Sequence, residues 1–214
     1  MILYFITFCV IFKQEIIFFA RKESFFMERI KCEQIASGSW LSLQKIHYRD
    51  NKGVERVWEA VGRKKSAGAV VMICRLTPSG RIILVRQYRP PADSLVVEFP
   101  AGLINPGEDP AEAAVRELRE ETGYKGRVLA MIPDSYSSPG MSSEVIRQVL
   151  MEADEEEQGE LITEFDEAED IETLLVHPDE LSDFLAEVSR NGNRVDGKVF
   201  SFAQGYLMHK KEND

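Results

Sequence analysis

Short stretches of alternating or continuous hydrophobic residues, separated by turn residues, follow one another along most of the chain after residue 40. This pattern predicts strands at 40–48, 54–63, 67–76, 81–88, 95–99, 127–132, 145–152 and 171–176. The turn sequences DNKG at 50–53 and TPSG at 77–80 each separate two such stretches, which is typical of β-hairpins. Apolar residues at helical spacing predict helices at 110–122, 178–189 and 199–208. We therefore predict a mixed α+β fold with helices packed on a central sheet.

The first 26 residues have a different pattern. Residues 1–12 are almost wholly apolar, and polar residues at 13–15 separate them from a second apolar run at 16–20. Neither run approaches the roughly 18 residues that a membrane-spanning helix needs. The stretch also lacks the basic start and small-residue end of a secretory signal peptide. We expect 1–26 to be an N-terminal extension without function, with weak membrane association as the alternative.

The helix predicted at 110–122 has clear start and stop signals. Asp109 is a typical N-cap residue, Pro110 is favoured in the first turn, and Gly123 is typical of a helix end. The segment around it, from 102 to 124, reads GLINPGEDPAEAAVRELREETGY. Its glycines, arginines and acidic residues stand in an order that solvent exposure alone would not impose.

Acidic residues one helical turn apart give this helix a charged face. Glu117 and Glu121 are four residues apart, which places them roughly 6 Å from each other. Like charges at this spacing cost about 0.3 kcal/mol in an isolated helix, and a divalent cation would offset that repulsion. Arg116 lies four residues before Glu120 and can pair with it. Taken alone, two glutamates four apart are typical of a solvated helix face.

Composition narrows the class of protein. The 214 residues include 36 acidic and 26 basic side chains, which gives a formal net charge of −10. No basic stripe offers to neutralise nucleic-acid phosphates, so we expect no nucleic-acid partner. Cys9, Cys32 and Cys74 lack metal-binding spacing and are interpreted as free thiols, which favours a reducing, cytoplasmic location.

The segment 102–124 resembles the Nudix box, and the chain from about Trp40 to its C-terminus is similar to Nudix hydrolases of the ADP-ribose pyrophosphatase subgroup. Tyr124 departs from the box, since the family usually has an aliphatic residue there. The resemblance implies a Nudix-type α/β/α sandwich with a mixed sheet and an N-terminal antiparallel strand region. It divides the chain into a strand region at 27–65, for dimerisation and base binding, and a hydrolase domain at 66–214.

The resemblance also implies a metal site around the box. The implied ligands are the backbone carbonyl of Ala101 together with Glu117, Glu121 and Glu108, the last of which binds an outer metal or supports the loop. Glu120 becomes either a second ligand or a partner of Arg116, and both are implied to serve catalysis. The implied ion is Mg²⁺, with Mn²⁺ as the alternative.

Further residues match substrate-binding positions of the subgroup, namely Trp40, Trp58, Glu59, Arg63, Arg89, Pro139 and Gly140. The two tryptophans are implied to sandwich the base, with stacking worth about 1–3 kcal/mol. Arg89 is implied to contact the pyrophosphate, for which the guanidinium is well suited. Without the resemblance, the tryptophans are interpreted as core or interface residues and Arg89 as a surface charge.

The catalytic base implied by the resemblance is a glutamate on a loop that precedes a late strand. Glu169 stands just before the strand predicted at 171–176 and matches best, with Glu164 and Glu167 as alternatives. Most other acidic residues of this stretch are expected to be solvated loop charges.

The implied activity is Mg²⁺-dependent hydrolysis of the pyrophosphate bond of ADP-ribose to AMP and ribose 5-phosphate, by a cytoplasmic homodimer. Enzymatic alternatives are hydrolysis of another nucleotide sugar, such as GDP-mannose or UDP-glucose, or of a dinucleotide. From another class, a non-catalytic ADP-ribose sensor is the alternative, although every box carboxylate is present here. A non-enzymatic acidic interaction module also remains, and only the box argues against it. We expect no membrane partner.

Overall fold

The computed structural model describes residues 27–165 and 170–213. By its internal contacts the chain divides into two compact units. Of the described residues, one unit contains 27–32 and Ile46–Trp58, and the other contains Glu33–Lys45, 59–165 and 170–213. No helix in the described part has the length and hydrophobicity that crossing a membrane requires.

The N-terminal strands form a three-stranded sheet in the order β1 (Glu28–Ser37), β2 (Leu41–Arg49), β3 (Glu55–Arg63). The connection between β2 and β3 turns at Asp50, whose carboxylate accepts hydrogen bonds of 2.9 Å from the backbone N–H groups of Lys52 and Val54. Gly53 has a φ of 77°, a left-handed conformation that favours glycine. The hairpin predicted at 50–53 is therefore confirmed.

The larger sheet contains eight strands of the described chain, in the order β11-β6-β5-β4-β9-β8 with β10 paired to β5 and β7 to β4. They are β4 (Ala69–Thr77), β5 (Ile82–Arg89), β6 (Ser94–Glu98), β7 (Ala101–Leu103), β8 (Arg127–Met131), β9 (Ile146–Asp154), β10 (Ile171–Val176) and β11 (Arg194–Val195). The sheet is mixed, because β4 pairs in parallel with β9 and antiparallel with β5. A short 3-10 helix, η2 (Pro90–Ala92), joins β5 to β6.

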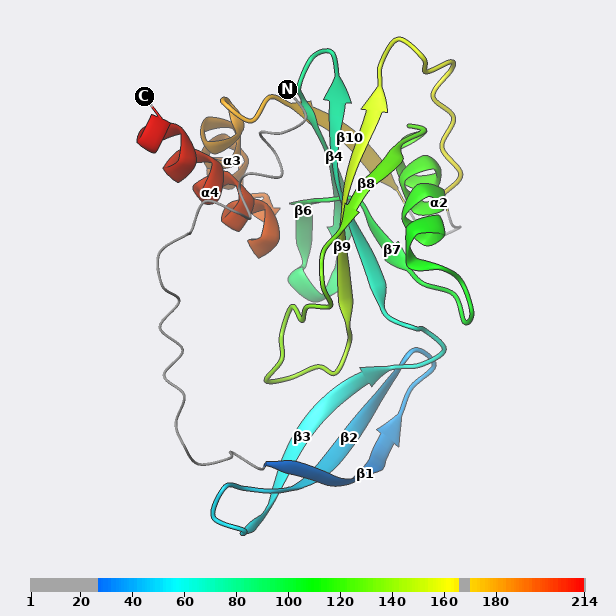
Figure 1. Cartoon of the computed structure of the whole chain (residues 1–214), viewed down its shortest axis with the longest axis vertical. Coiled ribbons are helices and arrows are strands. Elements are labelled where there is room, and N and C mark those ends of the chain that lie inside the picture. The colour runs from blue at the N-terminus through cyan, green and yellow to red at the C-terminus, as the bar shows by residue number, and fades with distance from the viewer. Residues whose placement is uncertain (1–26, 166–169, 214) are drawn as a thin grey trace. The chain divides into compact units, whose positions relative to one another are not determined.

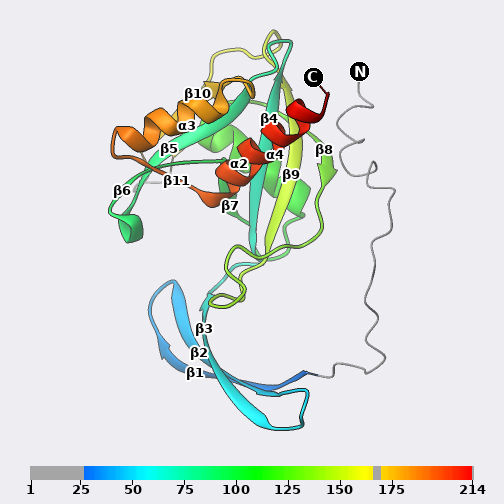
Figure 2. The same ribbon diagram turned by 90° about the vertical axis from the view of Figure 1, so that its left-hand side faces the viewer.

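Helices cover both faces of this sheet, namely α2 (Pro110–Thr122), α3 (Leu181–Arg190) and α4 (Gly197–Asn213). Figure 1 shows α2 on one side of the strands and α3 and α4 on the other. In Figure 2 the same layers are seen with α3 and α4 in front of the strands. Alternation along β4 explains the layering, because Val70 and Met72 share a core with Leu118 of α2, whereas Val71 shares a core with Leu185 of α3. The predicted α/β/α sandwich with a mixed sheet is confirmed.

Three strands were not predicted from the sequence. Every residue of β1 is exposed, so the strand carries no alternation of buried and exposed positions. The strands β7 and β11 are three and two residues long, which is too short for a period to show. The helix α3 begins at Leu181, later than the prediction of 178. The type of every predicted strand and helix is confirmed.

Candidate active site

Three glutamates and an arginine of the box and both predicted substrate-binding arginines meet in one cavity of about 720 Å³. Its lining includes six carboxylates and four cationic side chains, which are Glu98, Glu117, Glu120, Glu121, Glu144, Glu164, Arg63, Arg89, Arg116 and Lys198. Ala101 and Gly102 of β7 also line it. All of these residues belong to the unit that contains Glu59–Asp214. A cavity with this many charges is suited to a charged ligand rather than an apolar one.

The helix α2 presents the carboxylates because its ends and its buried face fix its position. The Asp109 carboxylate accepts hydrogen bonds from the backbone N–H groups of Ala111, at 2.8 Å, and Glu112, at 3.3 Å, as the sequence predicted for an N-cap. At the other end, Gly123 has a φ of 75° and its N–H bonds to the Arg119 carbonyl. The buried face of the helix includes Leu118, which is fully buried. The opposite face is thereby turned toward the cavity.

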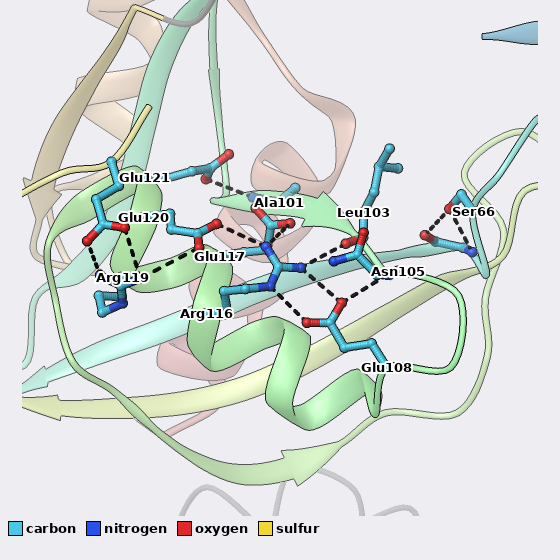
Figure 3. A network of polar contacts seen from close by, with 12 residues as sticks. Ser66, Ala101, Leu103, Asn105, Glu108, Arg116, Glu117, Arg119, Glu120 and Glu121 are labelled. Carbon is cyan, nitrogen blue, oxygen red and sulfur yellow. Dashed lines mark hydrogen bonds and ion pairs between the residues drawn. The ribbon is translucent and has the colours of Figure 1, made fainter. Parts of the chain in front are cut away.

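Arg116 is the centre of the charged network, as Figure 3 shows. Its Nε and Nη2 donate to the Glu108 carboxylate at 2.8 and 3.0 Å, and its Nη1 donates to Glu117 at 2.8 Å and to Glu120 at 2.9 Å. Nη2 also donates to the Leu103 carbonyl at 3.2 Å. These bonds raise the pKa of Arg116, chiefly through Glu108. The predicted pairing of Arg116 with Glu120 is present, and the same guanidinium holds two further carboxylates.

Glu108 supports the loop that precedes α2. Besides Arg116, its carboxylate accepts a 2.9 Å hydrogen bond from the backbone N–H of Asn105. The bond from Arg116, helped by the one from Asn105, lowers the pKa of Glu108 to about 2. The structure thus places Glu108 in the loop-supporting position, one of the two alternatives left by the sequence, and its role toward a metal stays a prediction.

Glu121 and Glu117 approach β7 from the helix. Glu121 is buried, and its carboxylate accepts a 3.1 Å hydrogen bond from the Ala101 N–H. Glu117 lies so close to Gly102 that a Cβ at that position would stand 1.9 Å from the Glu117 carboxyl carbon. A glycine is therefore required at 102 if the Glu117 carboxylate is to keep this place.

The donor set suits a hard divalent cation in its chemistry. Glu117, Glu120 and Glu121 all line one cavity, and carboxylate oxygens with a backbone carbonyl, such as that of Ala101, are the ligands Mg²⁺ prefers. Within residues 27–165 and 170–213, however, no three acidic, histidine or cysteine side chains converge closely enough to enclose an ion. Arg116 donates hydrogen bonds to Glu117 and Glu120, and the Ala101 N–H donates one to Glu121. Metal binding would exchange these hydrogen bonds for coordination.

The two predicted substrate-binding arginines also carry acidic partners. Nε of Arg89 donates to the Glu98 carboxylate at 2.7 Å, and Arg63 is paired with Glu144. Glu98 is 9% exposed, and this burial raises its pKa, against the opposing effect of Arg89. The carboxylates hold the arginine side chains at the cavity wall, which fixes cationic groups there before a ligand arrives.

Of the base candidates, the structure describes Glu164 alone. Glu164 lines the cavity, its backbone N–H donates to the Glu120 carbonyl at 2.8 Å, and its carboxylate is paired with Arg119. The Arg119 guanidinium lowers the pKa of Glu164, which makes this carboxylate a weaker base. Glu167 and Glu169 lie outside the described residues.

The remaining predicted substrate residues stay predictions. Trp40 is 72% exposed, and Trp58, in the other compact unit, is 51% exposed. Glu59, Pro139 and Gly140 are exposed as well. Exposed tryptophans are uncommon in a folded monomer and leave both indoles accessible to a ligand or a partner.

Sequence reasoning missed Glu98, Glu144 and Lys198, which line the cavity. The sequence does carry a signal for Glu98, which is the one charged residue in the apolar stretch 95–99. A buried carboxylate there is costly unless it is paired. Glu144 follows two serines and Lys198 lies between Gly197 and Val199, and neither position carries such a signal.

Comparison with known proteins places the chain in a family. The NUDIX domain model matches residues 65–195. The ADP-ribose pyrophosphatase of Saccharomyces cerevisiae is 37% identical over 182 residues, covering 80% of this chain and 79% of the yeast protein. The ADP-sugar pyrophosphatase of Mus musculus is 42% identical over 118 residues, covering 52% and 54%. A crystal structure of an ADP compounds hydrolase superimposes with a TM-score of 0.63 at 21% identity, covering 89% of this chain and 98% of that one.

Proposed function

The chain belongs to the Nudix hydrolase family, and on this basis we propose that it hydrolyses ADP-ribose to AMP and ribose 5-phosphate. The observation that supports this most directly is the meeting of three box carboxylates with Arg89 and Arg63 in a single cavity. The names of the yeast and mouse relatives support an ADP-linked sugar as the substrate. Family members need a divalent metal, and we propose Mg²⁺, with Mn²⁺ as the alternative.

In the proposed reaction, a water oxygen bonds to one phosphorus while the bond from that phosphorus to the bridging oxygen breaks. The bridging oxygen leaves with the other phosphate, and the water's protons pass to a base and the solvent. A bound divalent cation supplies charge neutralisation on the diphosphate and a more acidic water. Glu117, Glu120, Glu121 and the Ala101 carbonyl would hold it.

Arg116 orients the carboxylates for this purpose. Its guanidinium contacts Glu117 and Glu120 while Glu108 fixes it from the loop side. These hydrogen bonds fix the positions of the two carboxylates at the cavity before any ligand enters. Arg89 would contact the diphosphate from the β5 side of the cavity, where Glu98 holds it.

We propose Glu169 as the base that accepts the water proton, since it precedes β10 as the subgroup's loop glutamate precedes its strand. The pairing of Glu164 with Arg119 supports this order of preference, because a carboxylate with a lowered pKa attracts a proton less well.

The proposal includes a cytoplasmic homodimer in which Trp40 and Trp58 bind the base, helped by Glu59 and Arg63, with Pro139 and Gly140 next to the ribose. The exposure of both indoles supports it. Nucleotide-binding indoles must be accessible in the free protein, and stacking on them accepts any base.

A substrate panel tests the proposal. The purified protein with Mg²⁺ is incubated with ADP-ribose, GDP-mannose, UDP-glucose, NADH and diadenosine polyphosphates, and products are resolved by chromatography. We expect the highest kcat/KM with ADP-ribose and AMP as a product. A preference for another nucleotide sugar would refute the substrate while keeping the chemistry. ADP-ribose binding without turnover would identify a sensor instead of an enzyme.

A further inference from the structure

Lys198 is a cation on the cavity wall that the Nudix box does not contain. It is the second residue of α4, far from the box in sequence, yet it lines the same cavity as Arg89 and Glu98. Its side chain is 30% exposed, so the ammonium is accessible but partly enclosed. The next residue, Val199, is fully buried in the core beneath α4, which fixes the backbone at this position.

Asp196 holds Lys198 in two ways. Its carboxylate accepts the backbone N–H of Lys198 and the Nζ of the same residue, both at 2.8 Å. The Asp196 backbone N–H in turn donates to the Val97 carbonyl of β6 at 2.9 Å. Because Glu98 follows Val97, the Lys198 ammonium is anchored beside the strand that positions Arg89.

The balance of charged side chains lining the cavity indicates a role for Lys198 in binding an anionic ligand. Six carboxylates face four cations among the lining residues, so the cavity is net negative without a ligand. Arg116 already binds three carboxylates, which leaves it little capacity for phosphate. Within the described part of the chain, Arg89 and Lys198 each form an ion pair with one carboxylate, that of Glu98 and that of Asp196 respectively. A lysine ammonium with one carboxylate partner retains donors for phosphate oxygens.

We propose that Lys198 binds the diphosphate of the substrate, on the α4 side of the cavity, together with Arg89. This inference rests on the proposed function for the identity of the substrate, but its chemistry requires only a nucleoside diphosphate. Lys198 acts as a point charge in binding, whereas the carboxylates of α2 serve the reaction.

The test compares Lys198→Met with a control on the same helix. Lys210→Met is matched, because Lys210 also pairs with an aspartate, Asp179 at 2.7 Å, but is not among the cavity-lining residues. For ADP-ribose hydrolysis with Mg²⁺ we expect Lys198→Met to raise KM about tenfold and leave kcat within about threefold. Lys198→Arg is expected to restore most of the affinity, and Lys210→Met to change neither constant. A KM for Lys198→Met within about twofold of wild type would overturn the inference.

Calorimetric binding separates this inference from the proposed function. With Mg²⁺ present, ADP is expected to bind Lys198→Met about tenfold more weakly than wild type, while adenosine binds both equally. If Lys198→Met lost affinity for ADP and adenosine equally, Lys198 would have a structural role and the inference would be overturned. Wild-type protein that binds ADP in this manner but does not hydrolyse ADP-ribose would refute the proposed function alone. Lys198→Gln provides the same comparison if Lys198→Met unfolds.

Discussion

Replacing Glu108 by glutamine tests the loop-supporting network around Arg116. Glu108 accepts two bonds from Arg116 and one from the Asn105 N–H, and its pKa falls from 4.5 to about 2. In a dry site this lowering corresponds to roughly 3 kcal/mol. The Arg116 and Glu108 side chains are 29% and 16% exposed, so solvent screens the pair. We therefore expect Glu108→Gln to lower the free energy of unfolding by about 1.5 kcal/mol at neutral pH.

The direction of the pKa shift of Glu108 determines how its contribution to the free energy of unfolding changes with pH. The pKa of Glu108 is lower in the folded protein than in the unfolded one, so its ionised form stabilises the fold above the unfolded pKa of 4.5. That contribution is lost as the pH falls from 4.5 toward 2, where wild-type Glu108 becomes protonated. Urea denaturation followed by tryptophan fluorescence, from neutral pH to about pH 3, should show the wild-type and mutant stabilities converging.

Glu112→Gln is the matched control, because Glu112 lies exposed on the first turn of the same helix. We expect it to change the free energy of unfolding by less than about 0.5 kcal/mol. A stability gap between wild type and Glu108→Gln that stays constant down to acid pH would refute the ionic role of Glu108. A difference in the free energy of unfolding no larger than that between wild type and Glu112→Gln would refute it as well.

Three further predictions concern neighbouring residues. Gly102→Ala should displace the Glu117 carboxylate and lower kcat at least about tenfold, with little change in the thermal unfolding midpoint. The reason is that the added Cβ would stand 1.9 Å from the Glu117 carboxyl carbon, and an unchanged kcat would contradict the need for a glycine at this position. Asp109→Ala should cost about 1 kcal/mol in urea denaturation, because the N-cap of α2 is lost, and a neutral effect would contradict its capping role. Glu169→Gln should lower kcat by at least about 100-fold and Glu164→Gln by much less, and the reverse order would exchange their roles.

The helix α2 and its charged face could be predicted from the sequence because their determinants are local. Asp109 and Gly123 are the capping residues directly before and after the helix, and both are recognised from their residue types. The helical period places Glu117 and Glu121 on one face. The pairing of Arg116 with Glu120 follows from the same spacing. None of these inferences required knowledge of which other segments lie nearby.

The rest of the cavity could not be predicted because it depends on contacts between distant segments. Glu98 meets Arg89 through the pairing of β5 with β6, and Lys198 reaches the cavity because β11 pairs with β6 just before α4 begins. Nothing in the local sequence around Lys198 encodes this pairing. The exposed strand β1 was missed for a related reason, since a strand without a buried face has no hydrophobic period.

The central claim is that the carboxylates of α2 support metal-dependent hydrolysis of ADP-ribose. It is tested most directly by the kcat for ADP-ribose, measured against Mg²⁺ concentration for wild type and Glu121→Gln. We predict that chelated wild type is inactive, that Mg²⁺ restores its activity, and that Glu121→Gln stays at least about 100-fold slower at saturating Mg²⁺ while unfolding at the wild-type temperature. Turnover by Glu121→Gln at the wild-type rate, or by wild type without a divalent metal, would contradict the account.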